Sequence, residues 1–127
     1  MITATYDGAE RQFEIDAQYV GYFENAIGRS LYGILKAITE GQWTFADVAA
    51  VVSFGLHGPS EVEKIAAKAY RQARLHGFSY GQTGIVPRKD VLAVLERDGH
   101  GNYAELAADI LADAIFRKKA AEGNEAA

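Results

Sequence analysis

Three histidines are the side chains in this chain that are best suited to hold a metal ion or to act as a base. His57, His76 and His100 each stand next to a glycine at the expected end of a helix. None has a second histidine or a carboxylate three or four residues further on in the same helix, which is the spacing that directs two ligands at one ion. We interpret them as solvated or helix-capping histidines near the negative end of a helix dipole, and we expect no metal site.

The segment ERDGHGNYAEL can be aligned with a calcium-binding loop. With Glu96 at the first ligand position, Asp98 and His100 fall at the third and fifth, and Gly101 falls on the turn glycine. The twelfth position, which requires a bidentate glutamate, is Ala107. Because the ligand set is incomplete, we predict that this segment is a turn between two helices.

The sequence also lacks a complete motif for a catalytic nucleophile or for phosphate binding. The segment SFGLHG has neither the G-x-S-x-G order nor the preceding strand of a nucleophile elbow. Neither G-x-x-x-x-G-K-[ST] nor G-x-G-x-x-G occurs, and Glu61 and Glu63 point to different sides of one predicted helix. We therefore expect no enzymatic activity and no cofactor. An enzyme that uses residues 77–87 as a lid has only that loop in its favour.

The composition is that of an ordinary globular domain. The 127 residues are 49% hydrophobic and 24% charged, and none is cysteine, which suits a reducing cytoplasm. The chain has 13 Lys and Arg against 17 Asp and Glu, which gives a net charge of -4. A protein of this charge lacks the broad positive field that usually drives nucleic-acid binding. The N-terminus lacks the pattern of a signal peptide, and no apolar run approaches the length of a membrane span. We expect a cytoplasmic protein with no nucleic-acid and no membrane partner.

Two kinds of element must position these side chains. The N-terminal residues alternate as a hairpin does, with a turn at Asp7-Gly8, a loop nearer four residues than two, and Phe13 and Ile15 on one face. After Asp16 the apolar period changes to about 3.6 residues, which predicts helices. We expect these over residues 17–28, 31–40, 45–57, 61–77, 87–98 and 103–119. Asp16, Ser30, Thr44 and Ser60 are the expected N-caps of the first four, and Asp47 and Glu63 are the expected capping-box acids of the third and fourth.

The predicted fold is mainly α, an N-terminal β-hairpin followed by a compact bundle of five or six short helices. It forms one domain over residues 1–120, with a possible sub-boundary in the 77–87 loop and a disordered tail over 121–127. Gly21 inside the first helix predicts a close helix contact. Two of the helices should each bury an apolar stripe. In the helix over 45–57 the stripe is Phe45, Val48, Ala49, Val52 and Leu56. In the helix over 61–77 it is Val62, Ile65, Ala66, Ala69 and Ala73.

The aromatic residues divide into two groups. Trp43, Phe45, Phe54 and Phe23 are expected in the protein's own core. Tyrosine is enriched at interfaces because its ring adds contact area at little entropic cost. The candidate partner-binding residues, which lie off the main stripes, are Tyr22, Tyr32 and Tyr70.

A small helix-turn-helix regulator is the alternative function. Residues 45–74 contain two helices joined by a short glycine turn, and the second carries Lys64, Lys68, Arg71 and Arg74, which could face phosphates. Its N-terminus, however, presents Glu61 and Glu63, and a charged row on an amphipathic helix is usually its solvated face.

Ten positions in the first half form a further pattern. An acidic residue and a short gap precede a glycine and a hydrophobic run, and a glycine turn then leads to an Asp-Val helix that ends in Gly-Leu-x-Gly. These features fall on Glu24, Gly28, Leu31, Leu35, Gly41, Asp47, Val48, Gly55, Leu56 and Gly58. The pattern resembles the small tail assembly chaperones of gene transfer agents and tailed phages, and RQFEID is similar to their short strand. The second half, from HGFSYGQTGIVP onward, departs from it.

This resemblance implies a function in virion assembly for a bacteriophage, a prophage or a gene transfer agent. It implies a protein of the bacterial host cytoplasm that binds the tape measure protein and keeps it soluble until the tail tube polymerises. The tail tube protein is a further expected partner, and we expect a homo-oligomer. Covering the stripe of a long amphipathic client is helix-in-groove recognition.

Overall fold

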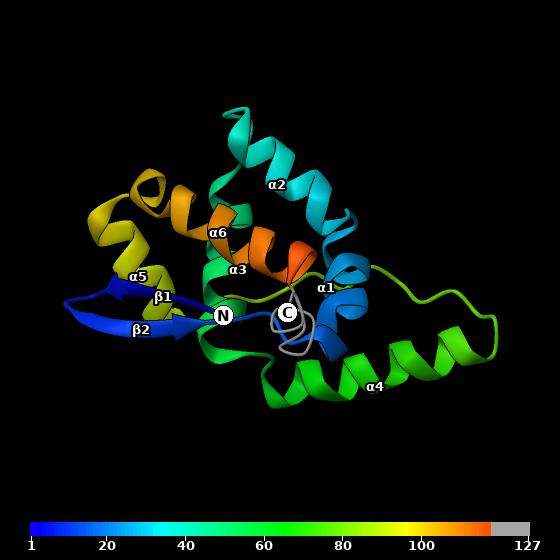
Figure 1. Ribbon diagram of the computed structural model, residues 1–127. Coiled ribbons are helices and arrows are strands. Elements are labelled where there is room, and N and C mark those ends of the chain that lie inside the picture. The colour runs from blue at the N-terminus through cyan, green and yellow to red at the C-terminus, as the bar shows by residue number, and fades with distance from the viewer. Residues whose placement is uncertain (118–127) are drawn as a thin grey trace, which may run out of the picture.

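The structure, a computed structural model, describes residues 1–117. Within this part of the chain the predicted fold class is confirmed, because a two-stranded hairpin is followed by six α-helices (Figure 1). The elements are β1 (Ile2–Tyr6), β2 (Ala9–Phe13), the 3-10 helix η1 (Ala17–Tyr19), α1 (Val20–Ile27), α2 (Leu31–Thr39), α3 (Phe45–His57), α4 (Glu61–Leu75), α5 (Lys89–Asp98), the 3-10 helix η2 (His100–Tyr103) and α6 (Ala104–Phe116). The predicted disordered tail, residues 121–127, lies outside the described residues.

The hairpin has a tighter turn than we predicted. β1 and β2 pair antiparallel up to Tyr6 and Ala9, so only Asp7 and Gly8 connect them. Their φ angles are 51° and 79°, and two successive positive φ angles give the turn that matches the twist of hairpin strands. The expected loop of about four residues is therefore wrong. Phe13 at the far end of β2 is fully buried and fixes the hairpin to the helices.

Helix α3 runs through the centre of the molecule and is buried on every side from Asp47 to Gly55 (Figure 1). Its start is capped as predicted, because Thr44 Oγ1 accepts a hydrogen bond from the Asp47 N–H at 3.1 Å. Asp47 Oδ2 in turn accepts one from the Thr44 N–H at 3.0 Å. A helix that is apolar all round is one that other elements enclose. Phe45, expected in the core, instead lies at the open end of α3 and is 67% exposed.

The other elements pack around α3. Helices α2 and α6 lie against each other and α6 also contacts α3, while β2 and α5 contact other faces of α3. The approach of α6 is close, because a Cβ built on Gly55 would lie 3.2 Å from Ile110. The close contact predicted at Gly21 is confirmed: a Cβ there would lie 3.3 Å from the hydroxyl of Tyr70 on α4.

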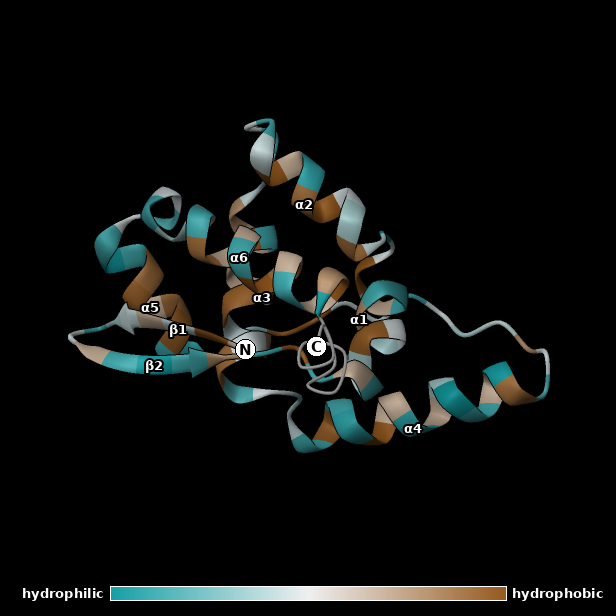
Figure 2. Ribbon diagram, in the orientation of Figure 1, coloured by the Kyte–Doolittle hydropathy of each residue, from teal (hydrophilic) through white to brown (hydrophobic). Residues whose placement is uncertain are grey.

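Helix α4 touches the rest of the protein through one narrow face. Glu63 and Ala67, which are four residues apart, are buried, and Tyr70 is half-buried. Part of the stripe that we expected in the core is on the other side, where Val62 is 76% and Ile65 is 71% exposed and Ala69 is exposed as well. Ala66, in contrast, is half-buried against the core. Figure 2 shows apolar residues recurring along α4 at the lower edge of the molecule. The predicted burial is therefore wrong for Val62, Ile65 and Ala69.

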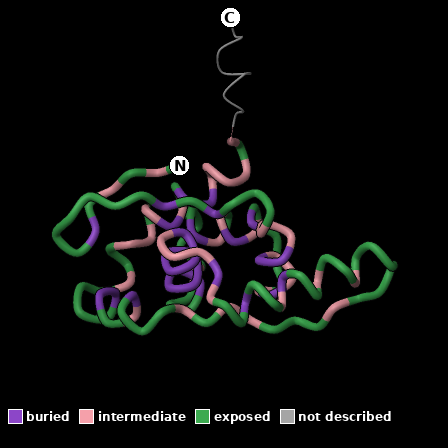
Figure 3. Tube along the Cα trace, turned by 90° about the horizontal axis from the view of Figure 1, so that it is seen from below, coloured by how far each residue is buried: buried purple, intermediate pink, exposed green. Residues whose placement is uncertain are grey.

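Residues 76–88, here called the strap, lead from the end of α4 back to α5. The Gly84 N–H donates to the carbonyl of Ala26 at 2.8 Å, and the Val86 N–H donates to Glu63 Oε2 at 3.1 Å. The Arg88 N–H donates to Ser53 Oγ at 2.8 Å. The elements before and after the strap contribute to one hydrophobic core. Figure 3 shows that the distal part of α4 and the strap form a largely exposed arm beside this core.

Candidate interaction surface

The histidines do not come together as a catalytic or metal centre. His57 Nε2 lies 3.2 Å from Asp90 Oδ2, which connects α3 to α5, and His76 is exposed at the end of α4. His100 stacks on Phe45 with ring centroids 4.6 Å apart. Among residues 1–117, no three side chains of His, Cys, Asp or Glu are grouped as metal ligands would be.

The segment that could be aligned with a calcium loop forms structural bonds. Arg97 donates to Asp98 Oδ1 at 2.7 Å and to Asp7 Oδ1 at 2.9 Å, which holds the hairpin turn against the end of α5. Tyr103 donates its hydroxyl to Asp98 Oδ2 at 2.5 Å. The hydrogen bonds from Arg97 and Tyr103 lower the pKa of Asp98 to about 2. Burial, with the bond to Asp98, raises the pKa of Tyr103 to about 12.

The first part of the sequence pattern lies at the junction of α1, α2 and α3. Glu24 Oε2 accepts a hydrogen bond from the Leu31 N–H at 2.7 Å, so an α1 side chain caps the start of α2. Gly28 ends α1 with a φ of 82°, a conformation that favours glycine. Arg29 forms an ion pair with Asp47, the residue that completes the capping box of α3. These contacts fix the turn between three helices.

The rest of the pattern has similar packing roles. Gly41 and Gly58 end α2 and α3 with φ angles of 74° and 70°, and Gly55 is the point of close approach to α6. Val48 is fully buried. Leu31 is buried, and Leu35 and Leu56 are half-buried against the core. The pattern residues therefore hold the fold together, and they do not form an open surface.

The three tyrosines that we selected for partner contacts have different environments. Tyr22 is 2% exposed and belongs to the core, and its burial raises the pKa of its hydroxyl. It is therefore removed from the candidate surface. Tyr70 is half-buried between α1 and the strap, with its ring edge against Tyr80 and its hydroxyl accepting from Arg74 at 3.0 Å. Tyr32 is 59% exposed on α2 and stays a candidate.

Five of the nine large hydrophobic side chains that are exposed in the described residues lie on α4 and the strap. The α4 stripe, which we define as Val62, Ile65 and Ala69, follows the i, i+3, i+7 spacing of one helical face and is open to solvent. Val86 of the strap, 77% exposed, is fixed by its backbone to Glu63 on one flank of α4. Further along the arm, Leu75 and Phe78 are 76% and 70% exposed. Apolar residues gathered in this way are typical of an interaction site.

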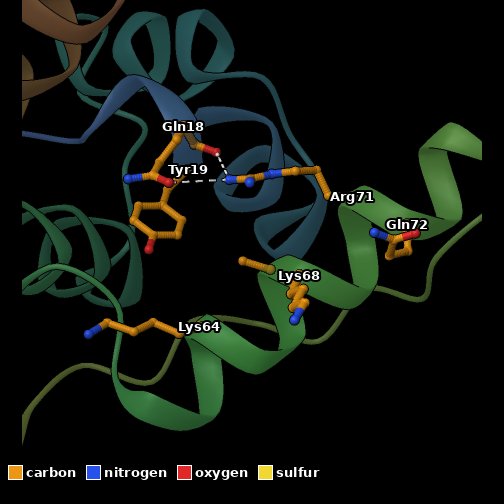
Figure 4. Close-up of a pocket in the computed structure, with 7 residues that line it drawn as sticks. Gln18, Tyr19, Lys64, Lys68, Arg71 and Gln72 are labelled. Carbon is orange, nitrogen blue, oxygen red and sulfur yellow. Dashed lines mark hydrogen bonds between the residues drawn. The ribbon is translucent and has the colours of Figure 1, made fainter.

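A cleft of about 280 Å³ lies on the other flank of α4, where the helix passes η1. Figure 4 shows Lys64, Lys68 and Arg71 of α4 on one side of this cleft, and Gln18 and Tyr19 of η1 on the other. Arg71 reaches across and donates to the carbonyl and to Oε1 of Gln18, at 3.2 Å and 3.4 Å. The α4 stripe is thus bordered by a cationic cleft.

Sequence reasoning missed this surface because it assumed that the larger apolar stripe of α4 must face inward. The capping box of Ser60 and Glu63 was recognised, and it could have indicated the inward face. Glu63 Oε1 accepts from the Ser60 N–H at 3.0 Å while its other oxygen binds the strap. A carboxylate with two backbone donors can be buried, so the helix face that contains it can face the core.

Within residues 1–117, no helix has the length and apolar character that crossing a bilayer requires. Comparison of the chain with protein-family models, curated proteins and solved structures finds no match.

Proposed function

We propose that this protein is a tail assembly chaperone of a bacteriophage or gene transfer agent. It binds the tape measure protein in the cytoplasm of the bacterial host and keeps it soluble until the tail tube polymerises. The observation that carries the proposal is the α4 stripe with its exposed Val62 and Ile65. The resemblance of the pattern residues to that family adds to it.

The geometry of the stripe suits a helical client. Its three members repeat along about two turns of α4, which is the arrangement that packs against the apolar stripe of a second helix. Ala69 is small, so the backbone of a partner helix can approach closely there. Leaving this stripe in water is unfavourable by roughly 25 cal/mol per Å² of apolar surface, and covering it on binding recovers that free energy.

The surface also serves the expected self-association. Val62 and Ile65 can be covered by a second copy when no client is present, and the tail tube protein is a further partner. Neither role needs a catalytic group or cofactor, and we propose a binding protein without enzymatic activity.

Co-expression with the cognate tape measure protein tests the proposal. The chaperone should raise the soluble fraction of the tape measure protein and should co-purify with it. Expression of the tape measure protein alone is the control. No co-purification and no gain in solubility would overturn the proposal.

The alternative, a helix-turn-helix regulator, is favoured by the cations of α4. Arg71 and Arg74, however, bond back to Gln18 and Tyr70, and Glu61 is exposed at the end of the helix that would enter the major groove. A salt-dependent shift of duplex DNA, weakened uniformly by Lys64→Ala or Lys68→Ala, would support the regulator instead.

A further inference from the structure

The cations beside the α4 stripe form a row of their own. Lys64, Lys68 and Arg71 are spaced i, i+4, i+7, so they share one helical face. Ile65 and Lys68 are three residues apart and therefore neighbours on the helix surface. The apolar stripe and the cationic row thus run side by side along α4.

The charge of this row is largely uncompensated. Of the described residues that line the cleft, none is acidic. Arg71 is held by two oxygens of Gln18 that carry no net charge, so its position is fixed and its charge is kept. Lys64 is 3.4 Å from Glu61, but that pair is between side chains that are 51% and 88% exposed, and such pairs are weak and exchange readily.

A second, larger hollow is lined by charges of both signs. It lies between α1 and the strap and measures about 500 Å³. Glu24 lines it together with Arg29 and Arg74, so both signs of charge are present. The cleft between η1 and α4, by contrast, has cations as its only charged lining residues and lies beside the exposed α4 stripe.

We propose that α4 binds an acidic amphipathic helix. The apolar stripe of this helix covers Val62, Ile65 and Ala69, and the Asp or Glu residues on one flank enter the cleft and meet Lys64, Lys68 and Arg71. This inference rests on the proposed function for the identity of the natural client. It adds that the segment by which the client binds must be acidic. Complementary charge of this kind selects the partner and its orientation.

Binding of designed peptides tests the proposal with the full-length protein. Three helical peptides share one leucine stripe and carry glutamate, glutamine or lysine along one flank. Fluorescence anisotropy should rank their affinities glutamate, then glutamine, then lysine. The glutamate peptide should lose affinity as salt is raised, because exposed charges are screened.

Charge reversal supplies the decisive variant. Lys64→Glu/Lys68→Glu should lower the affinity for the glutamate peptide by about tenfold, and this variant should bind the lysine peptide more tightly than the glutamate peptide. The matched control is Lys36→Glu/Lys89→Glu, which changes the net charge equally at two exposed lysines outside the cleft. Circular dichroism of both variants checks that the fold is kept.

The outcomes separate the two proposals. Equal affinities for the three peptides, with a soluble tape measure complex, would overturn the acidic partner and leave the chaperone function standing. No binding of any peptide would overturn this inference, and failure of the co-expression as well would overturn the function. Binding of duplex DNA that is lost in the Lys64→Glu/Lys68→Glu variant would assign the cleft to nucleic acid and refute the inference.

Discussion

Truncation of Ile65 to alanine should leave the free energy of unfolding almost unchanged. Ile65 is 71% exposed, so folding removes less than a third of its surface from water. Full burial of an isoleucine side chain is worth about 1.5–3 kcal/mol, and truncation here therefore forfeits at most about 1 kcal/mol. The higher helix propensity of alanine returns up to about 0.5 kcal/mol. The net change should lie within about 0.5 kcal/mol.

Ile110→Ala is the matched buried control. Ile110 is fully buried in α6 beside Gly55, so its truncation leaves a cavity and should cost about 2–5 kcal/mol. Urea denaturation gives both values, followed by the fluorescence of Trp43, the single tryptophan of the chain. The measurement is made at two protein concentrations, because a copy of the protein that covers Ile65 would make its effect depend on concentration.

A loss above about 2 kcal/mol for Ile65→Ala at low protein concentration would contradict the exposed position of Ile65. It would mean that the α4 stripe faces the core, as the periodicity of the sequence first predicted. A loss that is found only at high concentration would show that the stripe is exposed in the single chain and is covered when copies associate.

Three further predictions concern side chains that cap a helix or join neighbouring elements. Asp47→Ala should cost about 1–3 kcal/mol in urea denaturation, more than Arg29→Ala, because it removes a helix cap as well as an ion pair, whereas Arg29 is 41% exposed. The pKa of Asp98 is lowered from 3.8 to about 2, so its contribution to stability is present above pH 4 and is lost as the pH falls towards 2. Asp98→Asn should remove this part of the acid dependence. An unchanged dependence of the free energy of unfolding on pH would contradict this prediction. Glu63→Gln should weaken the bond to the strap and speed hydrogen exchange of the Val86 amide, and equal exchange in both proteins would show that this bond does not hold the strap.

Local sequence signals predicted much of the fold. Asp16, Ser30, Thr44 and Ser60 were recognised as helix caps, and the side chain of each accepts a backbone N–H in the structure. These bonds form between residues two or three positions apart, so the sequence itself contains both partners. The size of the hairpin turn was missed, although Asp7-Gly8 is the pair that adopts two positive φ angles.

The interaction surface could not be predicted in this way. The spacing of Val62 and Ile65 identifies a helical face, but it does not tell whether another element covers that face. Whether this face is covered depends on Glu63 and Ala67, which pack the opposite side of α4 against the rest of the protein. The same limit applies to Phe45, because its ring stacks on His100 of η2, which is far away in the sequence, and no other element within residues 1–117 covers its exposed side.

The most direct test of the account is the soluble yield of the tape measure protein when it is co-expressed with a stripe variant. Val62→Asp/Ile65→Asp places two charges on the exposed face of α4. The control is Phe45→Asp, which places a charge at a residue of similar exposure at the N-terminal end of α3, the end that is not connected to α4. We predict that the wild type and Phe45→Asp keep the tape measure protein soluble, and that Val62→Asp/Ile65→Asp, folded by circular dichroism, does not. Undiminished solubility with Val62→Asp/Ile65→Asp would contradict the claim that α4 is the binding surface.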